Sequence, residues 1–549
     1  MVITRRAGIL FLPVLAVAFL LSYTLTCDPD VPWHLKTGQV ILERGALLRT
    51  NTFSSIWPDH PWPNPEWLFQ VLLAVLHRAG GFVAIGALKV ALTIAFAGAL
   101  YTLMISRSGH PGLAAALSVL ALGAMQFRLS ERPHLVSYLF FTLTLLIAER
   151  ARAGPSRLPW LLPPLFAVWS NIHPEFIFGV LALAAVLTGD AIDRRFAPPG
   201  PASRQARLLV PAALCLPAAC LNPEGYHALL FPFLHTFIGP IVEVSEYAFT
   251  SPLRMPTYWI LATITAAVLL RARRTPVGSE VLLAGGTAVL GALYLRATPY
   301  FFLGCAPLLH RHAAAFAVAH SRAAAQRVGA LALVAAVAML SWALGFERLI
   351  PYRWGLGIDE TSWYPAAAAS AIERHALPGR IFNLYGDGGY LIYRLYPRYG
   401  VFQDGRLQAY PAEFIARVNA RLEYRDWPRL VEEYGVNTLL LTFEALAPLA
   451  PIEDWGMVFW DDRYFVLVRR TPQNAALLSR LEYRLFRPGF DFQAIADPGR
   501  LAALAREMER NQDERIEPSP LVARELNEVR AKLGRASRSK RGLIYFPGK

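Results

Sequence analysis

The sequence is poor in charged residues and in cysteine. Charged residues make up 17% of its 549 positions, whereas a soluble globular chain carries about 25%. Only four cysteines occur, all in or beside apolar segments, and none forms a Cys-x-x-Cys pair. No cysteine follows Cys305, so a disulfide framework in the C-terminal part is excluded.

The signatures of several enzyme classes are also missing. We find no Walker motif, haem-attachment motif, zinc-ligand spacing or nucleophile elbow. The formal net charge of +14 would suit a nucleic-acid-binding protein, but no basic stripe alternates with aromatic residues. The basic residues stand mostly in short segments between apolar blocks, where they act as topology signals. We therefore expect no nucleic-acid partner.

Apolar residues, in contrast, make up 54% of the chain and cluster in blocks. Ala7 to Thr26 carries no charge and follows Arg5-Arg6. Because no small-x-small cleavage site precedes Cys27-Asp28, we expect a first membrane helix and not a cleaved signal peptide. The other apolar blocks lie near residues 82–106, 112–127, 135–148, 158–170, 176–188, 208–221, 258–270, 281–295, 300–309 and 328–344.

These blocks predict an α-helical polytopic membrane domain of about eleven spans, several of them shorter than the roughly 20 residues of an ideal membrane helix. The apolar segment from Glu66 to Leu76 is too short to cross easily, and Gly80-Gly81 interrupts the chain after it. We expect this segment to be interfacial or re-entrant.

Basic residues distinguish the two sides of the membrane. If Glu66 to Leu76 does not cross, every segment on the side of the N-terminus is basic, as the positive-inside rule requires. These segments contain Arg107, Arg150 to Arg157, Arg194 to Arg207, Arg271 to Arg274 and Arg311 to Arg327. The prediction is a multi-pass protein with a cytoplasmic N-terminus, and an odd number of spans places its C-terminal domain outside.

Three regions follow from this map. Residues 1–345 form the membrane domain, with an external loop at 27–81. Residues 346–474 form an extracytoplasmic α/β domain, with strands expected at 380–384, 401–403, 436–442 and in a hairpin over 457–468, and helices near 411–422 and 427–434. In this domain Asp404-Gly405-Arg406 predicts a turn held by a local ion pair. Residues 475–549 form a helical, charged tail.

Polar residues gather in the segments on the outer side. They include Asp28, Asp30, Glu131, Arg132, His134, Asn171, His173, Glu175, Asn222, Glu224, His227 and Arg296. Such groups are costly to place beside membrane helices, and they often mark functional sites. Each one alone is also explained as a solvated loop end, and Arg296 as a side chain that reaches the interface.

The sharpest of these features is Asp28-Pro29-Asp30, directly after the first span. Two carboxylates two residues apart can share a divalent cation, or one can act as a base that the other positions. His34 lies one helical turn after Asp30. The alternative is a loop cap with Trp33 as an interfacial anchor.

The arrangement resembles the first external loop of the GT-C superfamily, the polyprenyl-phosphate-dependent membrane glycosyltransferases. The residues that carry the resemblance are the acidic pair, the short amphipathic stretch Gly38 to Gly45, the segment Trp62 to Leu68, and Gly80-Gly81 before the second span. The resemblance implies a catalytic acidic residue in this loop, juxtamembrane helices and an apolar helix leading to the second span.

A closer resemblance is to a group of poorly characterised bacterial membrane proteins of the same plan, over about residues 20–470. Its pattern is found in Trp33-His34-Leu35, Glu66-Trp67-Leu68, Arg132-Pro133, Trp169 to His173, Leu221-Asn222-Pro223 with Gly225, Arg296, Gly388 to Leu391 and Asp404-Gly405-Arg406. Pro32 stands where a second Trp is expected, and the Trp-Trp-Asp motif of oligosaccharyltransferases is absent. Both departures argue against transfer of a whole oligosaccharide to protein.

The resemblance implies a glycosyltransferase of the bacterial cytoplasmic (inner) membrane. It would move a sugar from a polyprenyl-phosphate donor to a glycan or lipid acceptor of the cell envelope, on the outer face. Asp30 or Asp28 would take the acceptor's proton, with Asp30 preferred because it lies nearer Trp33 and His34. Asp28 and Asp30 are also the candidate ligands for Mg²⁺ or Mn²⁺. The candidate substrate- and phosphate-binding residues are His34, Glu66, Arg132, His134, His173 and Arg296.

Two other functions fit the same pattern. A transporter or flippase for a lipid-linked sugar would explain the many spans and the outward polar groups. A non-catalytic scaffold of the cell envelope would use the α/β domain to bind a partner, and Asp28 and Asp30 would then be dispensable.

Overall fold

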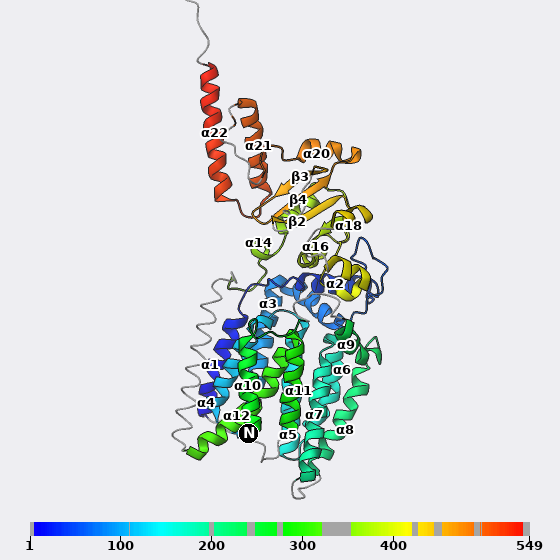
Figure 1. Cartoon of the computed structure of the whole chain (residues 1–549), viewed down its shortest axis with the longest axis vertical. Coiled ribbons are helices and arrows are strands. Elements are labelled where there is room, and N and C mark those ends of the chain that lie inside the picture. The colour runs from blue at the N-terminus through cyan, green and yellow to red at the C-terminus, as the bar shows by residue number, and fades with distance from the viewer. Residues whose placement is uncertain are drawn as a thin grey trace, which may run out of the picture. The chain divides into compact units, whose positions relative to one another are not determined.

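A bundle of helices and a smaller α/β unit make up the structure, a computed structural model (Figure 1). It describes residues 5–108, 110–196, 203–238, 248–271, 278–320, 353–419, 427–443, 453–487, 495 and 497–541. The first unit comprises Met1–Leu47 and Pro63–Ile358, and the second comprises Leu48–Trp62 and Asp359–Lys549. The short segment 48–62 therefore belongs to the second unit, although both of its ends lead into the first.

The described helices of the first unit run side by side in the bundle, with α2 at one end of it (Figure 1). They are α1 (Arg5–Ser22), α2 (Val31–Arg44), α3 (Trp67–Ser108), α4 (Pro111–Ala124), α5 (Pro133–Ala153), α6 (Leu162–Ile172), α7 (Phe176–Phe196), α8 (Ser203–Ala219), α9 (His227–Ile238), α10 (Pro256–Arg271), α11 (Gly278–Leu293) and α12 (Thr298–His320). Large aromatic side chains fill the core, among them Phe96, Tyr138, Trp169 and Tyr300.

Among the described residues, three helices are long and apolar enough to cross a membrane: Trp67–Ser106, Pro133–Ala153 and Phe176–Arg195. Five shorter apolar helices accompany them. Helix α9 is apolar too, and the sequence analysis did not predict it. The last predicted span, 328–344, lies outside the described residues, so the number of spans stays a prediction.

Helix α3 consists of two segments separated by a glycine pair. Gly80 (φ −158°) and Gly81 (φ 61°, ψ −154°) leave helical geometry, and the positive φ at Gly81 suits glycine because other residues carry a Cβ that clashes there. The break predicted after Glu66 to Leu76 is thus confirmed. The first segment packs against α2.

Prolines mark the helix ends beside Arg132 and His173. Pro133 begins α5, and Arg132 before it is extended (φ −111°, ψ 161°). His173 is likewise extended (φ −159°, ψ 137°) after the end of α6, where Pro174 follows. A residue that precedes proline is kept out of the helical region by the proline ring. Arg132 and His173 are therefore held at the bundle end in extended conformations.

The second unit contains a mixed four-stranded sheet of order β1-β2-β4-β3. Its strands are β1 (Ile381–Asn383), β2 (Thr438–Thr442), β3 (Trp455–Trp460) and β4 (Tyr464–Arg469). β1 and β2 are parallel, whereas β4 pairs antiparallel with both β2 and β3. The predicted hairpin and the strands near 380–384 and 436–442 are confirmed.

Short helices precede, separate and follow the strands along the chain, and two longer helices are the last described elements of the second unit. They are α14 (Glu360–Trp363), α15 (Ala366–Arg374), α16 (Gly388–Leu395), α17 (Ala412–Asn419), α18 (Trp427–Glu433), α20 (Ala475–Leu481), α21 (Pro498–Glu514) and α22 (Pro520–Arg541). Helix α22 extends through the basic run at the end of the tail to Arg541. The predicted helices near 411–422 and 427–434 correspond to α17 and α18.

The strand predicted at 401–403 is wrong. Val401 makes only an isolated bridge, to Ser54. The backbone beyond it bonds to the Asn383 side chain, which accepts from the Phe402 amide (2.9 Å) and donates to the Gln403 carbonyl (2.8 Å). An amide side chain has thus taken the hydrogen bonds that a neighbouring strand would have made.

Asp404 and Arg406 form the predicted local ion pair, 2.7 Å long and fully buried. The Arg406 guanidinium also lies over the rings of Phe53 (4.9 Å) and Trp62 (4.6 Å) and donates to Asn51. Three of these partners come from segment 48–62. The pair therefore fastens that segment to the rest of the second unit.

Candidate active site

The loop between α1 and α2 presents the two predicted acidic residues. The Asp28 carboxylate accepts from the Asp30 amide (3.0 Å), a turn typical of Asp. Asp30 precedes the first residue of α2 and accepts from the Trp33 indole (3.0 Å). Each side chain is 14% exposed, so both carboxylates are half-buried but accessible from the surface.

Arg132 joins both carboxylates. Its guanidinium lies 2.6 Å from Asp30 and 3.9 Å from Asp28. The short contact is a charge-assisted hydrogen bond. The structure thus brings Arg132 to an acidic pair that lies about a hundred positions earlier in the sequence, and Arg132 partly neutralises that pair.

A divalent cation would have to compete with this guanidinium for Asp28 and Asp30. Among the described residues, no group of three or more His, Cys, Asp or Glu is arranged to hold a metal ion. Mg²⁺ and Mn²⁺ favour several oxygen ligands, which Asp28 and Asp30 could supply only in competition with Arg132. Metal dependence stays a prediction.

Glu66 lies directly before α3 and faces two imidazoles. Its carboxylate oxygens are 3.5 Å from Nε2 of His173 and 3.9 Å from Nε2 of His34. His34 comes from α2 and stacks on Trp33, with ring centroids 3.6 Å apart. Burial raises the pKa of Glu66, against the opposing effect of His173 and Arg132.

Behind His173 lies a second, deeper carboxylate. Glu175 is 3% exposed and lies 3.3 Å from Nδ1 of His173. It also accepts from the hydroxyl of Tyr300 (2.6 Å) and from Arg296 (3.2 Å). Burial disfavours the charge of Glu175, but His173 and Arg296 outweigh it and lower its pKa. Glu175 therefore stays ionised and ties Arg296 to the cluster.

His134 differs from the other predicted site residues. It is buried, its Nε2 lies 2.7 Å from the Arg128 carbonyl, and its Nδ1 lies 3.3 Å from the Arg128 guanidinium. The carbonyl contact requires a proton on Nε2, so Nδ1 accepts from Arg128. Both ring nitrogens thus bind Arg128, and His134 supports the loop before α5.

We define the candidate site as Asp28, Asp30, His34, Glu66, Arg132, His173, Glu175 and Arg296. Glu175 is among the polar residues predicted to lie on the outer side, without a role of its own, and Tyr300 was not predicted from the sequence. An acidic residue beside an apolar block was the signal for Glu175. Tyr300 sits in an apolar helix, where a tyrosine gives no signal of its own.

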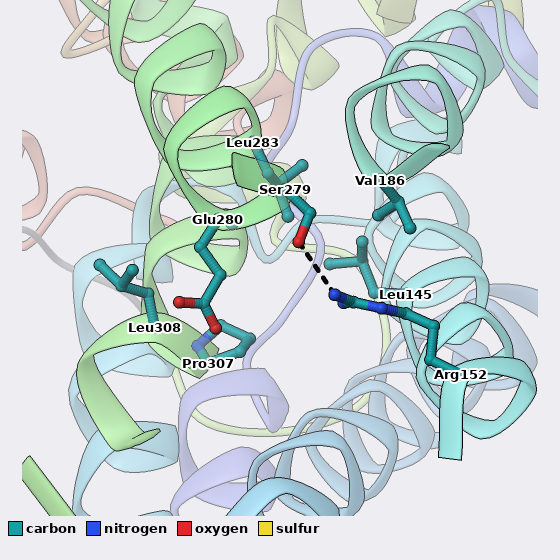
Figure 2. A pocket seen from close by; sticks show the side chains of 9 residues that line it. Leu145, Arg152, Val186, Ser279, Glu280, Leu283, Pro307 and Leu308 are labelled. Carbon is teal, nitrogen blue, oxygen red and sulfur yellow. Dashed lines mark hydrogen bonds between the residues drawn. The ribbon is translucent and has the colours of Figure 1, made fainter. Parts of the chain in front are cut away.

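A separate polar cluster lies at the far end of α5. Arg152 stands 20 residues after Arg132, about 30 Å along a helix. It binds Glu149 (2.8 Å), Asp190 (2.8 Å) and Ser279 (3.1 Å). Figure 2 shows the bond to Ser279 beside a small pocket, lined mainly by apolar side chains. These polar groups contact one another and connect the ends of α5, α7 and α11.

No family model and no curated protein matches the chain. The archaeal oligosaccharyltransferase AglB from Archaeoglobus fulgidus, in complex with an inhibitory peptide and a dolichol-phosphate, has a similar structure, with a TM-score of 0.55 and 11% identity over 82% of this chain and 72% of that chain.

ArnT from Cupriavidus metallidurans, bound to undecaprenyl phosphate, aligns with a TM-score of 0.47 and 13% identity over 85% of this chain and 98% of that chain. The similarity to AglB shows a shared fold. The fold that the loop motifs predicted is thereby confirmed.

Proposed function

We propose that the chain is an integral membrane glycosyltransferase that transfers a sugar from a polyprenyl-phosphate donor to a glycan or lipid acceptor of the cell envelope. The outer face of a bacterial inner membrane is the proposed place of reaction. The observation that carries the proposal is the candidate site, where acidic, basic and imidazole side chains converge within a fold shared with an oligosaccharyltransferase.

The reaction requires a base for the acceptor hydroxyl as it attacks the anomeric carbon. Asp28 and Asp30 are the candidates. Arg132 compensates the charge of Asp30 at 2.6 Å, and the Trp33 indole occupies its other oxygen. Asp28 lies 3.9 Å from the guanidinium. We therefore assign proton transfer to Asp28 and the positioning of Arg132 to Asp30, reversing the order expected from sequence.

The leaving phosphate requires positive charge. Arg132 and Arg296 are 23% and 25% exposed, so both side chains reach the surface of the site. Guanidinium groups suit phosphate because their donors match its oxygens in pairs. His34 and His173 add ring nitrogens on either side of Glu66. We assign no substrate contact to His134, because both of its nitrogens bind Arg128.

The test is turnover by the purified protein in nanodiscs, with polyprenyl-phosphate sugars and candidate acceptors. Free polyprenyl phosphate is followed by mass spectrometry, with Mg²⁺, with Mn²⁺ and with a chelator. We expect release, and we expect Asp28→Asn to lower its rate roughly 10²- to 10⁴-fold, the contribution of a general base. Glu43→Gln is the matched control, because Glu43 is an exposed carboxylate of α2 that is not part of the candidate site.

The same assay separates the alternatives. Donor binding without release, together with movement of a lipid-linked sugar across vesicle membranes, would favour a transporter. No binding of any donor, with Asp28→Asn fully functional in cells, would favour a scaffold. Release that persists unchanged in Asp28→Asn but fails in Asp30→Asn would restore Asp30 as the base.

A further inference from the structure

Glu66 occupies an unusual position for a carboxylate near a phosphate site. Its side chain is 21% exposed, and each carboxylate oxygen faces an imidazole nitrogen, from His173 on one side and His34 on the other. The groups that act on it electrostatically are, besides His173, Arg132 before α5, Asp30 before α2 and Arg296 before α12. The two arginines proposed to receive the phosphate thus both act on Glu66.

An ionised carboxylate in this place would repel the phosphate. A protonated carboxyl group carries one O–H donor and could instead donate a hydrogen bond to a phosphate oxygen. Burial and Asp30 both raise the pKa of Glu66, while His173, Arg132 and Arg296 lower it, and the net direction is upward. An arriving phosphate would raise it further, since a nearby negative charge favours the neutral form.

The orientation of His173 fixes where the proton lies. Nδ1 of His173 is 3.3 Å from the ionised Glu175 and 2.9 Å from the Ser137 hydroxyl, which itself accepts from the Trp169 indole. An anion at Nδ1 favours a proton on that nitrogen. Nε2 then presents a lone pair toward Glu66. A lone pair and an ionised carboxylate repel each other, so this contact is favourable only when a proton lies between Nε2 and the carboxylate oxygen.

We propose that Glu66 and His173 share one proton and deliver it to the leaving phosphate of the donor, with Glu175 as the positioning residue that orients His173. This role rests on the proposed transfer reaction. The acceptor oxygen forms its bond to the anomeric carbon and gives its proton to Asp28. The bond from the anomeric carbon to the phosphate oxygen breaks, its electron pair stays on that oxygen, and the oxygen takes the proton from Glu66.

The experiment compares pH–rate profiles of the wild type, Glu66→Gln, Glu66→Asp and Glu175→Gln, with Glu43→Gln as the exposed control. A proton donor must be protonated to act, so the wild-type rate is expected to fall as the pH rises through the raised pKa of Glu66. Glu66→Gln keeps a hydrogen-bond donor but no transferable proton. It is expected to lose roughly 10²-fold in rate and the alkaline fall, while binding undecaprenyl phosphate normally.

The other variants separate transfer from structure. Glu66→Asp is expected to have a lower rate that still falls at alkaline pH. Glu175→Gln is expected to shift the pH at which the rate falls, because His173 loses the anion at Nδ1. Glu66→Gln with a wild-type profile would overturn the proposal. An additional fall on the acid side that depends on Glu66 would also overturn it, because it would make Glu66 a base.

A second readout does not depend on turnover. The infrared band of a protonated carboxyl group is expected to titrate with pH in the wild type, to grow when undecaprenyl phosphate binds, and to vanish in Glu66→Gln. Absence of this band in folded protein would overturn the shared proton. Its presence in protein that releases no polyprenyl phosphate would leave the proton pair standing and refute the transfer reaction.

Discussion

Lys89 and Glu131 form the most deeply buried ion pair beside the candidate site. Nζ of Lys89 lies 2.7 Å from Glu131, and both side chains are 2% exposed. Lys89 also donates to the carbonyl and the hydroxyl of Thr24, while the Thr26 hydroxyl donates to Glu131. Thr26 stands two residues before Asp28, and Glu131 stands beside Arg132. The Lys89–Glu131 pair therefore connects the loop that carries Asp28 to the segment that carries Arg132.

Removing one partner of this pair leaves the other charged and buried. We expect Glu131→Gln or Lys89→Met to destabilise the protein by about 3–5 kcal/mol, the usual cost of an uncompensated buried charge. Turnover should fall as well, because Arg132 and Asp28 lose their common support. Thermal unfolding in nanodiscs and the release assay measure the two effects.

The double variant Lys89→Met, Glu131→Gln is the control for the pair. With both charges gone, most of the lost stability should return, since a neutral pair carries no desolvation cost. Stability effects of the two single variants that simply add in the double variant would show that Lys89 and Glu131 do not act as a pair.

At the scale of the helix, one contact sets the position of His34 against Glu66. A Cβ on Gly38 would lie 1.9 Å from the Gln70 carbonyl oxygen, so α2 and the first segment of α3 touch there through backbone. His34 precedes Gly38 by one turn, and Glu66 precedes Gln70 by one turn. The close approach of the two helices thus places these two side chains together.

We expect Gly38→Ala to push α2 away from α3. A displacement of about 1 Å in a catalytic constellation can cost roughly 10²-fold in rate, and overpacking destabilises by about 1–3 kcal/mol. The control is Gly286→Ala in α11, where a Cβ meets nothing within 4 Å. Gly286→Ala should leave turnover unchanged and should leave the free energy of unfolding unchanged or slightly higher. Unchanged turnover in Gly38→Ala would mean that α2 does not position the site.

How far the sequence could predict this site depends on what kind of signal each residue carries. Polar residues beside apolar blocks indicated Asp28, Asp30, Arg132, His173 and Arg296, because membrane helices make such residues costly. The resemblance to known membrane proteins added His34 and Glu66. The break at Gly80-Gly81 was also readable, since glycine pairs interrupt helices. The strand at 401–403 was not, because a single distant amide, Asn383, decides its hydrogen bonds. Gly38 gave no signal, since a helix-facing glycine depends on its partner helix.

At the scale of the whole molecule, the chain passes between its two units three times, after Leu47, after Trp62 and after Ile358. Segment 48–62 is anchored in the second unit through Arg406, Asn51, Phe53 and Trp62. Its two ends lead to α2 and to Glu66, both parts of the candidate site. The second unit is thus covalently continuous with two parts of the candidate site.

The orientation of the chain in the membrane is a prediction from the basic segments, and it can be measured directly. In a background without the four native cysteines, single cysteines at Gly154 and Gly379 would report the two sides. Gly154 follows α5 beside Arg150 and Arg152, and Gly379 precedes β1 in the second unit; a Cβ at either position meets nothing within 4 Å. Neither has a positive φ, so cysteine fits both backbones.

We expect a membrane-impermeant maleimide to label Gly379→Cys in intact spheroplasts and to label Gly154→Cys only after the membrane is opened. The reason is that arginines at helix ends are retained on the cytoplasmic side, while a donor lipid presented on the outer face requires the acidic loop there. Labelling of Gly154→Cys in intact spheroplasts, with Gly379→Cys protected, would invert the orientation. The candidate site would then face the cytoplasm, and an outer-face transfer reaction would be refuted even if the purified protein releases polyprenyl phosphate.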